Sequence, residues 1–489
     1  MSCGTSLRSV ILDGRSLTPA DVESVARGMA KVELDDAARE RNAAARRALD
    51  ELVAGGEQVY GVTTGVGPFR TRAVPEDKRG DHQLRLLRSH ASGGGRPLPR
   101  EVVRAAMVVR ANQTGAGGAG LSDDLLGALV RALNDGFAPE AHELGSLGTG
   151  DLTVLAEIAV GLIDRYELEL GPRVGLGLMS SNAATIGHAA LIACDAGRLL
   201  DGALDVAALS FLAANADQVV LDERVHAARD HPGQVAAAAR MRELLGAERG
   251  ARRAGAGGTG GSDAGAPVQD PFPFRALPQV EGTAGDALAA LERVLAVELN
   301  AAGENPLIDP GEPAILPNAN FHGGALALAL DGFRGALAQS SSLCAERVTA
   351  MLDPDLTGLP AMLASDAGPG SGAMMLEYTA HAAAAAVRAL AAPVANQTAV
   401  VGSGVESHAS FAPIAARMAG EALDAASVAI ATELVVAVRG MRMREVEARS
   451  SPAGDLYARA AAALDPDVED RPLAGDVEAA RRLLRAESG

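Results

Sequence analysis

Four long stretches of the sequence repeat apolar residues at helical spacing, and each presents a stripe rich in alanine. They occupy residues 282–302, 323–352, 371–392 and 410–446. A helix of this length buries its apolar stripe by packing against neighbours of similar length. The pattern predicts a mostly α protein centred on a bundle of long helices.

The composition agrees with a helical protein. Aromatic residues make up only 2% of the 489 residues and tryptophan is absent, whereas aromatic and β-branched side chains are common in sheets. Residues 1–215 contain several glycine-rich loops, and we expect this loop-rich N-terminal region to carry active-site loops. We expect residues 216–489 to form the bundle and its C-terminal tail as one continuous unit.

Three local patterns lead to further expectations. Thr18 and Pro19 begin a helix that is predicted to continue to residue 54, because Pro is favoured at the first helical position. Residues 168–178 resemble a short hairpin. Residues 246–267 are rich in Gly, Ala, Ser and Thr without core-forming side chains, and they are predicted to be a flexible linker or a mobile lid.

Net charge, cysteine content and hydropathy lead to expectations about the ligand, metal binding and location of the protein. The formal net charge of −18 would repel nucleic acids and anionic membranes, so a small molecule is the expected partner. Cys3, Cys194 and Cys344 are few and widely spaced, which predicts neither a disulfide framework nor a metal site. No leader-like segment begins the sequence and no apolar run reaches about 20 residues, so we expect a cytoplasmic protein.

The glycine-rich stretch from Gly145 to Leu152 lies between two helical patterns. Its glycines permit a tight turn in which neighbouring peptide groups approach one another closely, so backbone atoms could take part in chemistry. A structural alternative is a loop in which Thr149 or Asp151 caps the following helix.

Several separate motifs follow one another along the chain. They are Tyr60-Gly61-Val62-Thr63-Thr64-Gly65, Leu87-Arg88-Ser89-His90-Ala91, the Gly145 turn, His231-Pro232-Gly233-Gln234, Gln269 with Arg275, Glu304-Asn305-Pro306-Leu307 and Asn320-Phe321-His322-Gly323. Other motif residues are Asp270, Pro278, Gln279 and Val280. Together and in this order, the motifs resemble those of the histidine and aromatic amino acid ammonia-lyase family.

The resemblance implies a carbon–nitrogen lyase with a long-helix fold, assembled as a homotetramer whose active sites are shared between subunits. Members of the family make an electrophile, methylidene-imidazolone (MIO), from an Ala-Ser-Gly triplet of their own backbone. The glycine nitrogen attacks the alanine carbonyl, and the serine loses water. The ring accepts electrons from the substrate amine while a tyrosine removes the β-proton.

The same resemblance implies roles for individual residues. Tyr60 corresponds to the base, Arg275 and Asn305 to the groups that bind the substrate carboxylate, and His90 and Glu406 to the selectors of the substrate side chain. Gln269, Phe272 and Ser180 complete the expected site. Each also has a structural interpretation: Tyr60 could hold a loop, Arg275 could pair with a surface acid, and Asn305 could set a turn.

The sequence departs from the family where the electrophile forms. The triplet aligned on Asp151 is Gly148-Thr149-Gly150, so the turn is one residue short and threonine replaces serine. Three supporting positions also differ: Ser180 replaces an asparagine, Phe272 a tyrosine and Val405 a glutamine. The coherent change predicts that no MIO forms and that the protein uses no cofactor.

Three functions remain open at this stage. The first is elimination from an amino acid or related small carboxylate, with Tyr60 as base. The second is an elimination, addition, cyclisation or isomerisation whose substrate needs no backbone electrophile. The third is a non-catalytic binding or assembly protein, which the retention of Tyr60, His90 and Glu406 disfavours.

Overall fold

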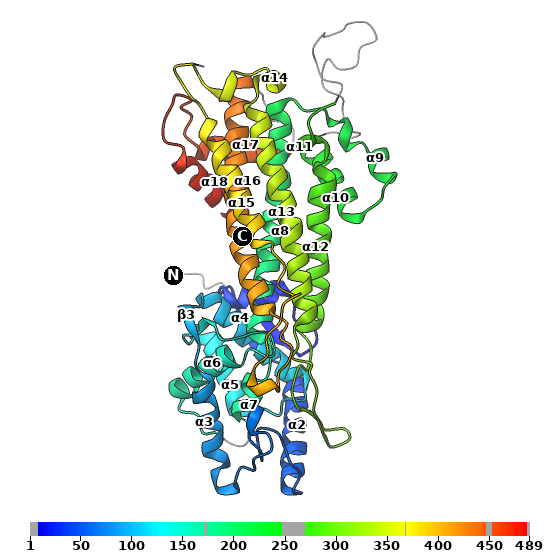
Figure 1. Ribbon diagram of the computed structural model, residues 1–489, viewed down its shortest axis with the longest axis vertical. Helices are drawn as coiled ribbons and strands as arrows, with labels where there is room; N and C mark the ends of the chain where they lie inside the picture. The colour runs from blue at the N-terminus through cyan, green and yellow to red at the C-terminus, as the bar shows by residue number, and fades with distance from the viewer. Residues whose placement is uncertain (1–7, 171–173, 247–268, 367, 446–451, 487–489) are drawn as a thin grey trace, which may run out of the picture. The chain divides into compact units, whose positions relative to one another are not determined.

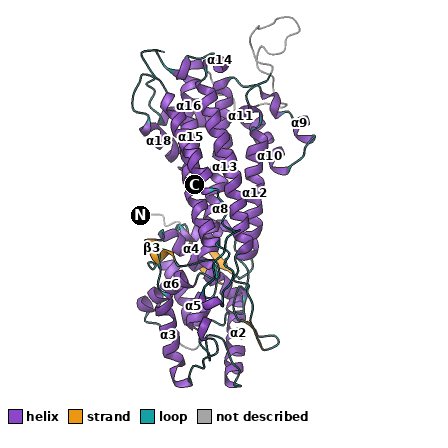
Figure 2. Ribbon diagram, in the orientation of Figure 1, coloured by secondary structure: helices purple, strands orange, loops and turns teal. Residues whose placement is uncertain are grey.

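The computed structural model describes residues 8–170, 174–246, 269–366, 368–445 and 452–486. Helices dominate these residues, and the few strands are short (Figure 2). The predicted mostly α fold is therefore confirmed. Most of the segment expected to be flexible, residues 247–267, lies outside the described residues.

The chain folds as two compact units, and each unit is assembled from three segments. Unit 1 comprises Met1–Cys194, Ala290–Asp331 and Pro393–Arg417. Unit 2 comprises Asp195–Ala289, Gly332–Ala392 and Met418–Gly489. The sequence predicted instead a single division at residue 215. Composition does not mark these boundaries, because several of them fall inside long helices.

Four long helices contribute residues to both units, and Figure 1 labels them. They are α8 (Ala183–Ala214), α12 (Leu277–Glu298), α13 (Gly324–Leu352) and α16 (Ala412–Arg444). Unit 2 also contains α9 (Glu223–Ala227), α10 (Pro232–Leu245), α11 (Phe272–Arg275), α14 (Pro354–Thr357), α15 (Met374–Leu390), α17 (Pro452–Ala463) and α18 (Ala474–Ala486). The four long helices predicted from the sequence correspond to α12, α13, α15 and α16, and their ends lie within about five residues of those expected.

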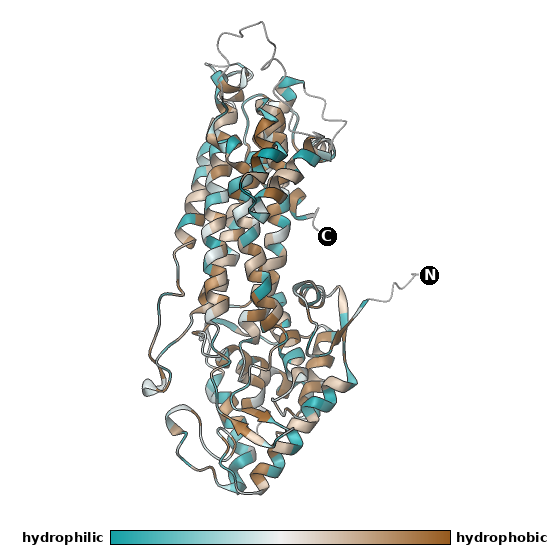
Figure 3. Cartoon of the chain, turned by 90° about the vertical axis from the view of Figure 1, so that its right-hand side faces the viewer, coloured by the Kyte–Doolittle hydropathy of each residue, from teal (hydrophilic) through white to brown (hydrophobic). Residues whose placement is uncertain are grey.

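The core of unit 2 consists largely of alanine, leucine and valine side chains from α8, α13, α15 and α16. Figure 3 shows apolar stretches, in brown, along the long helices of the chain. Alanine lets helix backbones approach closely, which explains how so few aromatic residues fill the core. Phe211 and Phe274 are an exception, since their rings meet edge to face at 5.3 Å.

A fully buried cluster of ionic and polar side chains lies within unit 2. The Arg347 guanidinium donates to both carboxylate oxygens of Glu433, at 2.6 and 2.9 Å, and lies 3.8 Å from Glu281. Ser210 donates to Glu433 and Ser340 to Glu281, each at 2.7 Å. Burial raises the pKa of Glu281, and the positive charge of Arg347 opposes this shift.

Unit 1 combines shorter helices with three two-stranded sheets within the described residues. Strands β1 (Arg8–Leu12) and β2 (Ala30–Leu34) are parallel, whereas β3 (Gly94–Pro97) with β4 (His142–Leu144) and β5 (Leu307–Asp309) with β6 (Ala314–Leu316) are antiparallel. The helices are α1 (Pro19–Ala26), α2 (Asp36–Ala54), α3 (Arg79–His90), α4 (Arg100–Ala116), α5 (Asp123–Asp135), α6 (Leu152–Tyr166) and α7 (Val174–Met179).

Two local predictions in unit 1 were wrong. The helix does begin at Pro19, capped by Thr18, but it ends at Ala26, and β2 interrupts the predicted helix. Residues Ala30 and Val32 alternate with exposed neighbours and pair with β1, which a search for helical spacing misses in so short a segment. The hairpin predicted at 168–178 is contradicted by α7, because a short apolar run can equally form a buried helix.

Across the ranges that the structure describes, no helix combines the length and apolarity needed to cross a membrane. The same ranges hold no cluster of three or more His, Cys, Asp or Glu side chains placed to bind a metal ion.

Candidate active site

The glycine-rich turn of unit 1 adopts a backbone that favours glycine. Gly148 and Gly150 have φ angles of +88° and +98°. A Cβ atom on Gly148 would lie 2.0 Å from the Ser410 hydroxyl and 3.0 Å from the Phe411 nitrogen. Any larger residue at position 148 would therefore require the turn or its neighbours to move.

Hydrogen bonds from distant parts of unit 1 hold this turn. The Ser410 hydroxyl donates to the Gly148 carbonyl at 2.9 Å, and the Gly150 N–H donates to Asn182 Oδ1 at 3.1 Å. Thr149 forms an isolated antiparallel bridge with His322. The turn and the segment around Ser410 thus form one hydrogen-bonded substructure.

Asp151 follows the turn and occupies the N-cap position of α6, but its side chain does not cap that helix. Its carboxylate instead accepts hydrogen bonds from the backbone N–H and hydroxyl of Thr185, at 2.7 and 2.8 Å. The capping alternative for Thr149 or Asp151 is therefore wrong. Because Asp151 is buried, its pKa is raised to about 6, although the bonds from Thr185 oppose this shift.

The raised pKa of Asp151 predicts a pH-dependent stability. Since the folded-state pKa of about 6 lies above the ordinary value of 3.8, the unfolded state loses its proton first as pH rises. The free energy of unfolding contributed by Asp151 should fall between about pH 4 and 6, by up to about 3 kcal/mol, and then remain constant.

Urea unfolding at several pH values tests this expectation. Relative to the unchanged protein, Asp151→Asn should lose that part of the pH dependence, whereas Asp164→Asn, an exposed change on the same helix, should retain it. Parallel curves for the unchanged protein and Asp151→Asn would contradict the assignment.

Thr149, Glu406 and Tyr60 lie near one another in unit 1, and we refer to this group as the centre of unit 1. The Thr149 hydroxyl donates to Glu406 Oε2 at 2.7 Å. Tyr60 is mostly buried, and burial raises the pKa of its hydroxyl. The Gly67 N–H donates to this hydroxyl at 2.8 Å and lowers the pKa, whereas the negative charge of Glu406 raises it further. Two predicted site residues, Tyr60 and Glu406, are thus close enough to interact electrostatically.

Asn305 and Ser180 are joined next to the turn. The Asn305 N–H donates to the Ser180 hydroxyl at 3.4 Å, and Asp151 donates through its own N–H to the carbonyl of Ser181 at 2.7 Å. Asn305 Oδ1 accepts from the Asn318 N–H at 3.1 Å. Within the described ranges, no protein acceptor engages Asn305 Nδ2, so this amide can donate to a ligand.

A buried ion pair fixes the residue that precedes Asn305. Arg110 and Glu304 are almost completely buried, and Arg110 Nη1 lies 2.7 Å from Glu304 Oε1. Arg110 also donates to the Gly177 carbonyl on α7. The start of the Asn305 loop is thereby anchored to α4 and α7.

His90 ends α3, where its Nδ1 meets the Leu86 carbonyl at 2.8 Å and the Ser89 hydroxyl at 3.2 Å. Among the described residues, no hydrogen bond connects His90 with Tyr60, Thr149 or Glu406. Its predicted role in selecting a substrate side chain therefore remains a prediction.

Gln269, Phe272 and Arg275 belong to unit 2. They lie together on and just before α11: Arg275 donates to Gln269 Oε1, and its guanidinium carbon lies 4.6 Å from the Phe272 ring centroid. Phe272 is 65% exposed. The structure thus groups these three predicted residues with one another in unit 2.

Four residues around the turn were not predicted to be part of the site. Asn182 and Ser410 bind the turn backbone, and His322 Nε2 lies 2.9 Å from Nδ1 of His408. Asn182 lies two residues after Ser180, His408 lies two residues after Glu406, and His322 belongs to a motif that the sequence contains, so these three had a recognisable signal. Ser410 had none.

Comparison with known proteins decides the family. A family model described as aromatic amino acid lyase matches residues 17–168 and 164–464. This chain belongs to that family. It is a carbon–nitrogen lyase of the ammonia-lyase type.

Relatives of this lyase extend over nearly the whole chain. Histidine ammonia-lyase from Caldanaerobacter subterraneus subsp. tengcongensis is 32% identical and covers 98% of this chain and 97% of that protein. The enzyme of the same name from Streptomyces coelicolor is 34% identical over the same shares.

Solved structures also match this lyase over nearly the whole chain. Ergothionase from Treponema denticola, an ergothioneine-degrading enzyme in complex with desmethyl-ergothioneine sulfonic acid, has a TM-score of 0.89 and 27% identity and covers 98% of this chain and 99% of its own. Tyrosine aminomutase from Streptomyces globisporus has a TM-score of 0.90 and 28% identity, with shares of 98% and 97%.

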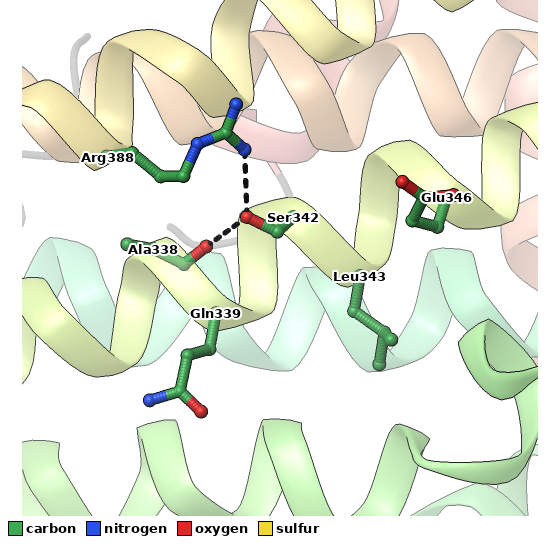
Figure 4. A pocket seen from close by; sticks show the side chains of 6 residues that line it. All are labelled: Ala338, Gln339, Ser342, Leu343, Glu346 and Arg388. Atoms are coloured by element: carbon green, nitrogen blue, oxygen red, sulfur yellow. Dashed lines mark hydrogen bonds between the residues drawn. The ribbon is translucent and has the colours of Figure 1, made fainter.

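The lyase also has a hollow of about 370 Å³ in unit 2, lined by residues of α13 and by Arg388 of α15 (Figure 4). Arg388 donates to the Ser342 hydroxyl at 3.1 Å, and Glu346 lies further along α13. None of the predicted site residues lines this hollow.

Proposed function

We propose that this lyase eliminates an amine from an amino acid or a related small carboxylate, with Tyr60 removing the β-proton, and that it does so without MIO. The observation that carries the proposal is the centre of unit 1, where Tyr60 interacts with Glu406 and Glu406 binds Thr149. The family and the retained acid–base groups support elimination over a non-catalytic binding or assembly role.

Each group has a distinct task in the proposed reaction. The Tyr60 phenolate accepts the β-proton, and the amine leaves as the carbon–carbon double bond forms. Asn305 Nδ2 donates to the substrate carboxylate, Glu406 and His90 are assigned to the substrate side chain, and Ser180 belongs to the same site in unit 1. Arg275, which the family implies as a second carboxylate-binding group, would join this site with Gln269 and Phe272 from another subunit of the homotetramer.

The residues at the turn differ from the triplet that forms MIO in the family. The turn is one residue short, and threonine stands in place of serine. Dehydrated threonine would carry a methyl group that shields the electrophilic carbon. These two departures support the proposal that the turn stays an ordinary peptide.

Without an electrophile to activate the amine, the substrate must carry a group that leaves readily by itself. Ergothioneine, which the structural neighbour ergothionase degrades, carries a quaternary ammonium, and this group leaves more readily than an unactivated amine. We therefore place betaine-type carboxylates ahead of histidine as candidate substrates. Addition, cyclisation or isomerisation remains the second candidate, favoured by the similarity to tyrosine aminomutase.

A substrate panel tests the proposal. The purified protein is incubated separately with L-histidine, L-tyrosine and ergothioneine, and the near-ultraviolet absorbance of the conjugated acid and the released amine are both measured. Elimination from at least one substrate is expected. Turnover that yields only an isomer favours the second candidate, and binding without turnover of any substrate would support the non-catalytic role.

We further infer a cytoplasmic homotetramer with active sites shared between subunits. The large side chains of Met375 and Tyr378 on α15 are 62% and 63% exposed, as expected for surfaces that a second copy could cover. Sedimentation at micromolar concentration should give a tetramer, and a monomer would contradict this inference.

A further inference from the structure

The segment that carries Glu406 is hydrogen-bonded directly to the glycine-rich turn. Phe411 donates through its N–H to the Leu147 carbonyl at 2.9 Å, and Ser410 binds the next carbonyl of the turn. Glu406 forms an isolated backbone bridge with Val401. Both partners of the Thr149–Glu406 hydrogen bond are therefore held by backbone contacts, and their distance is set by the fold.

The two oxygens of Glu406 differ in their surroundings. Oε2 accepts from Thr149, whereas Oε1 has no hydrogen-bond partner among the residues that the structure describes. Glu406 is only partly buried, so Oε1 is accessible to a ligand. Because its charge acts on Tyr60, a ligand that reaches Oε1 lies in the field of the proposed base.

We propose that Thr149 is a positioning residue that fixes Glu406 so that Oε1 accepts a hydrogen bond from an N–H group in the substrate side chain. The inference rests on the proposed function and deepens it. Threonine suits this task because its β-branch restricts χ1 and so limits the directions in which the hydroxyl can point. The residue at the position of the family's electrophile thereby becomes a determinant of specificity, which favours substrates with an N–H-bearing side chain over phenyl side chains.

Calorimetric binding of two unreactive ligands separates this role from catalysis. One ligand, 3-(imidazol-4-yl)propanoate, carries an N–H group, and the matched ligand, 3-phenylpropanoate, does not. Thr149→Val removes the hydroxyl at nearly constant shape and should weaken binding of the imidazole ligand about tenfold, with little effect on the phenyl ligand. Thr149→Ser should restore binding to within about threefold of the unchanged protein.

A double-mutant cycle completes the test. If Thr149 acts through Glu406, then Thr149→Val should cause no further loss in a Glu406→Gln background. Equal weakening of both ligands by Thr149→Val, failure of Thr149→Ser to restore binding, additive losses in the cycle, or no binding of the imidazole ligand to the unchanged protein would overturn the proposal. These measurements need no turnover, so a negative substrate panel leaves them interpretable.

Discussion

Replacing Tyr60 by phenylalanine is expected to lower kcat/KM by about 10²- to 10⁴-fold, because the variant lacks the oxygen that accepts the β-proton. The aromatic ring remains, so the packing of its loop should be preserved. Ligand binding by Tyr60→Phe should stay close to that of the unchanged protein.

The pH dependence of the reaction gives a second readout of Tyr60. Burial raises the pKa of the Tyr60 hydroxyl above the ordinary value of 10, and the negative charge of Glu406 raises it further. The base must be deprotonated, so kcat/KM should rise with pH throughout the neutral and alkaline range, until the protein unfolds.

Tyr166→Phe is the matched control for both readouts. Tyr166 lies on α6 in the same unit, where its hydroxyl meets Asp135 at 3.4 Å. This variant should retain activity within about twofold, as expected for surface changes. A Tyr60→Phe enzyme that is as active as Tyr166→Phe would contradict the assignment of the base.

Replacing Arg347 by methionine is expected to lower the free energy of unfolding by about 3–5 kcal/mol. Arg347 is the only cation that the structure places beside the buried carboxylates of Glu433 and Glu281 within the described residues. Its removal leaves the carboxyl group of Glu433 in the core without a cation, with the Ser210 hydroxyl and the Cys344 thiol as neighbouring donors. Removing one partner of a buried ion pair is strongly destabilising because the remaining group is left without a counter-charge.

Arg240→Met provides the comparison. Arg240 pairs with Asp205 and Glu243 in the same unit, but its side chain is 38% exposed, so the loss should stay below about 1 kcal/mol. Urea unfolding of both variants at one protein concentration measures the difference. Similar free energies of unfolding for the two variants would show that the buried cluster does not stabilise unit 2.

The long helices were predictable because their apolar spacing persists over many turns. The prediction of 323–352 differs from α13 by one residue at its start, and 410–446 exceeds α16 by two residues at each end. The strand β2 was missed because five residues between two helices give little periodicity and depend on pairing with β1. The two units interleave along the chain, which no local composition reveals.

The candidate site was predictable only as a set of separate motifs. Tyr60, Asn305 and Glu406 came from matches to the family, whereas their contacts depend on folding. The Thr149–Glu406 hydrogen bond joins residues 257 positions apart, and the bond from Ser410 to Gly148 joins residues 262 positions apart. No spacing in the sequence encodes such contacts.

The central claim is that Gly148-Thr149-Gly150 remains an ordinary peptide, and intact-protein mass spectrometry tests it most directly. We predict the full mass of the translated chain, and a peptide covering the triplet with its threonine unmodified. A deficit of two water molecules that maps to this peptide would show that cyclisation and dehydration have occurred, and it would contradict the electrophile-free account.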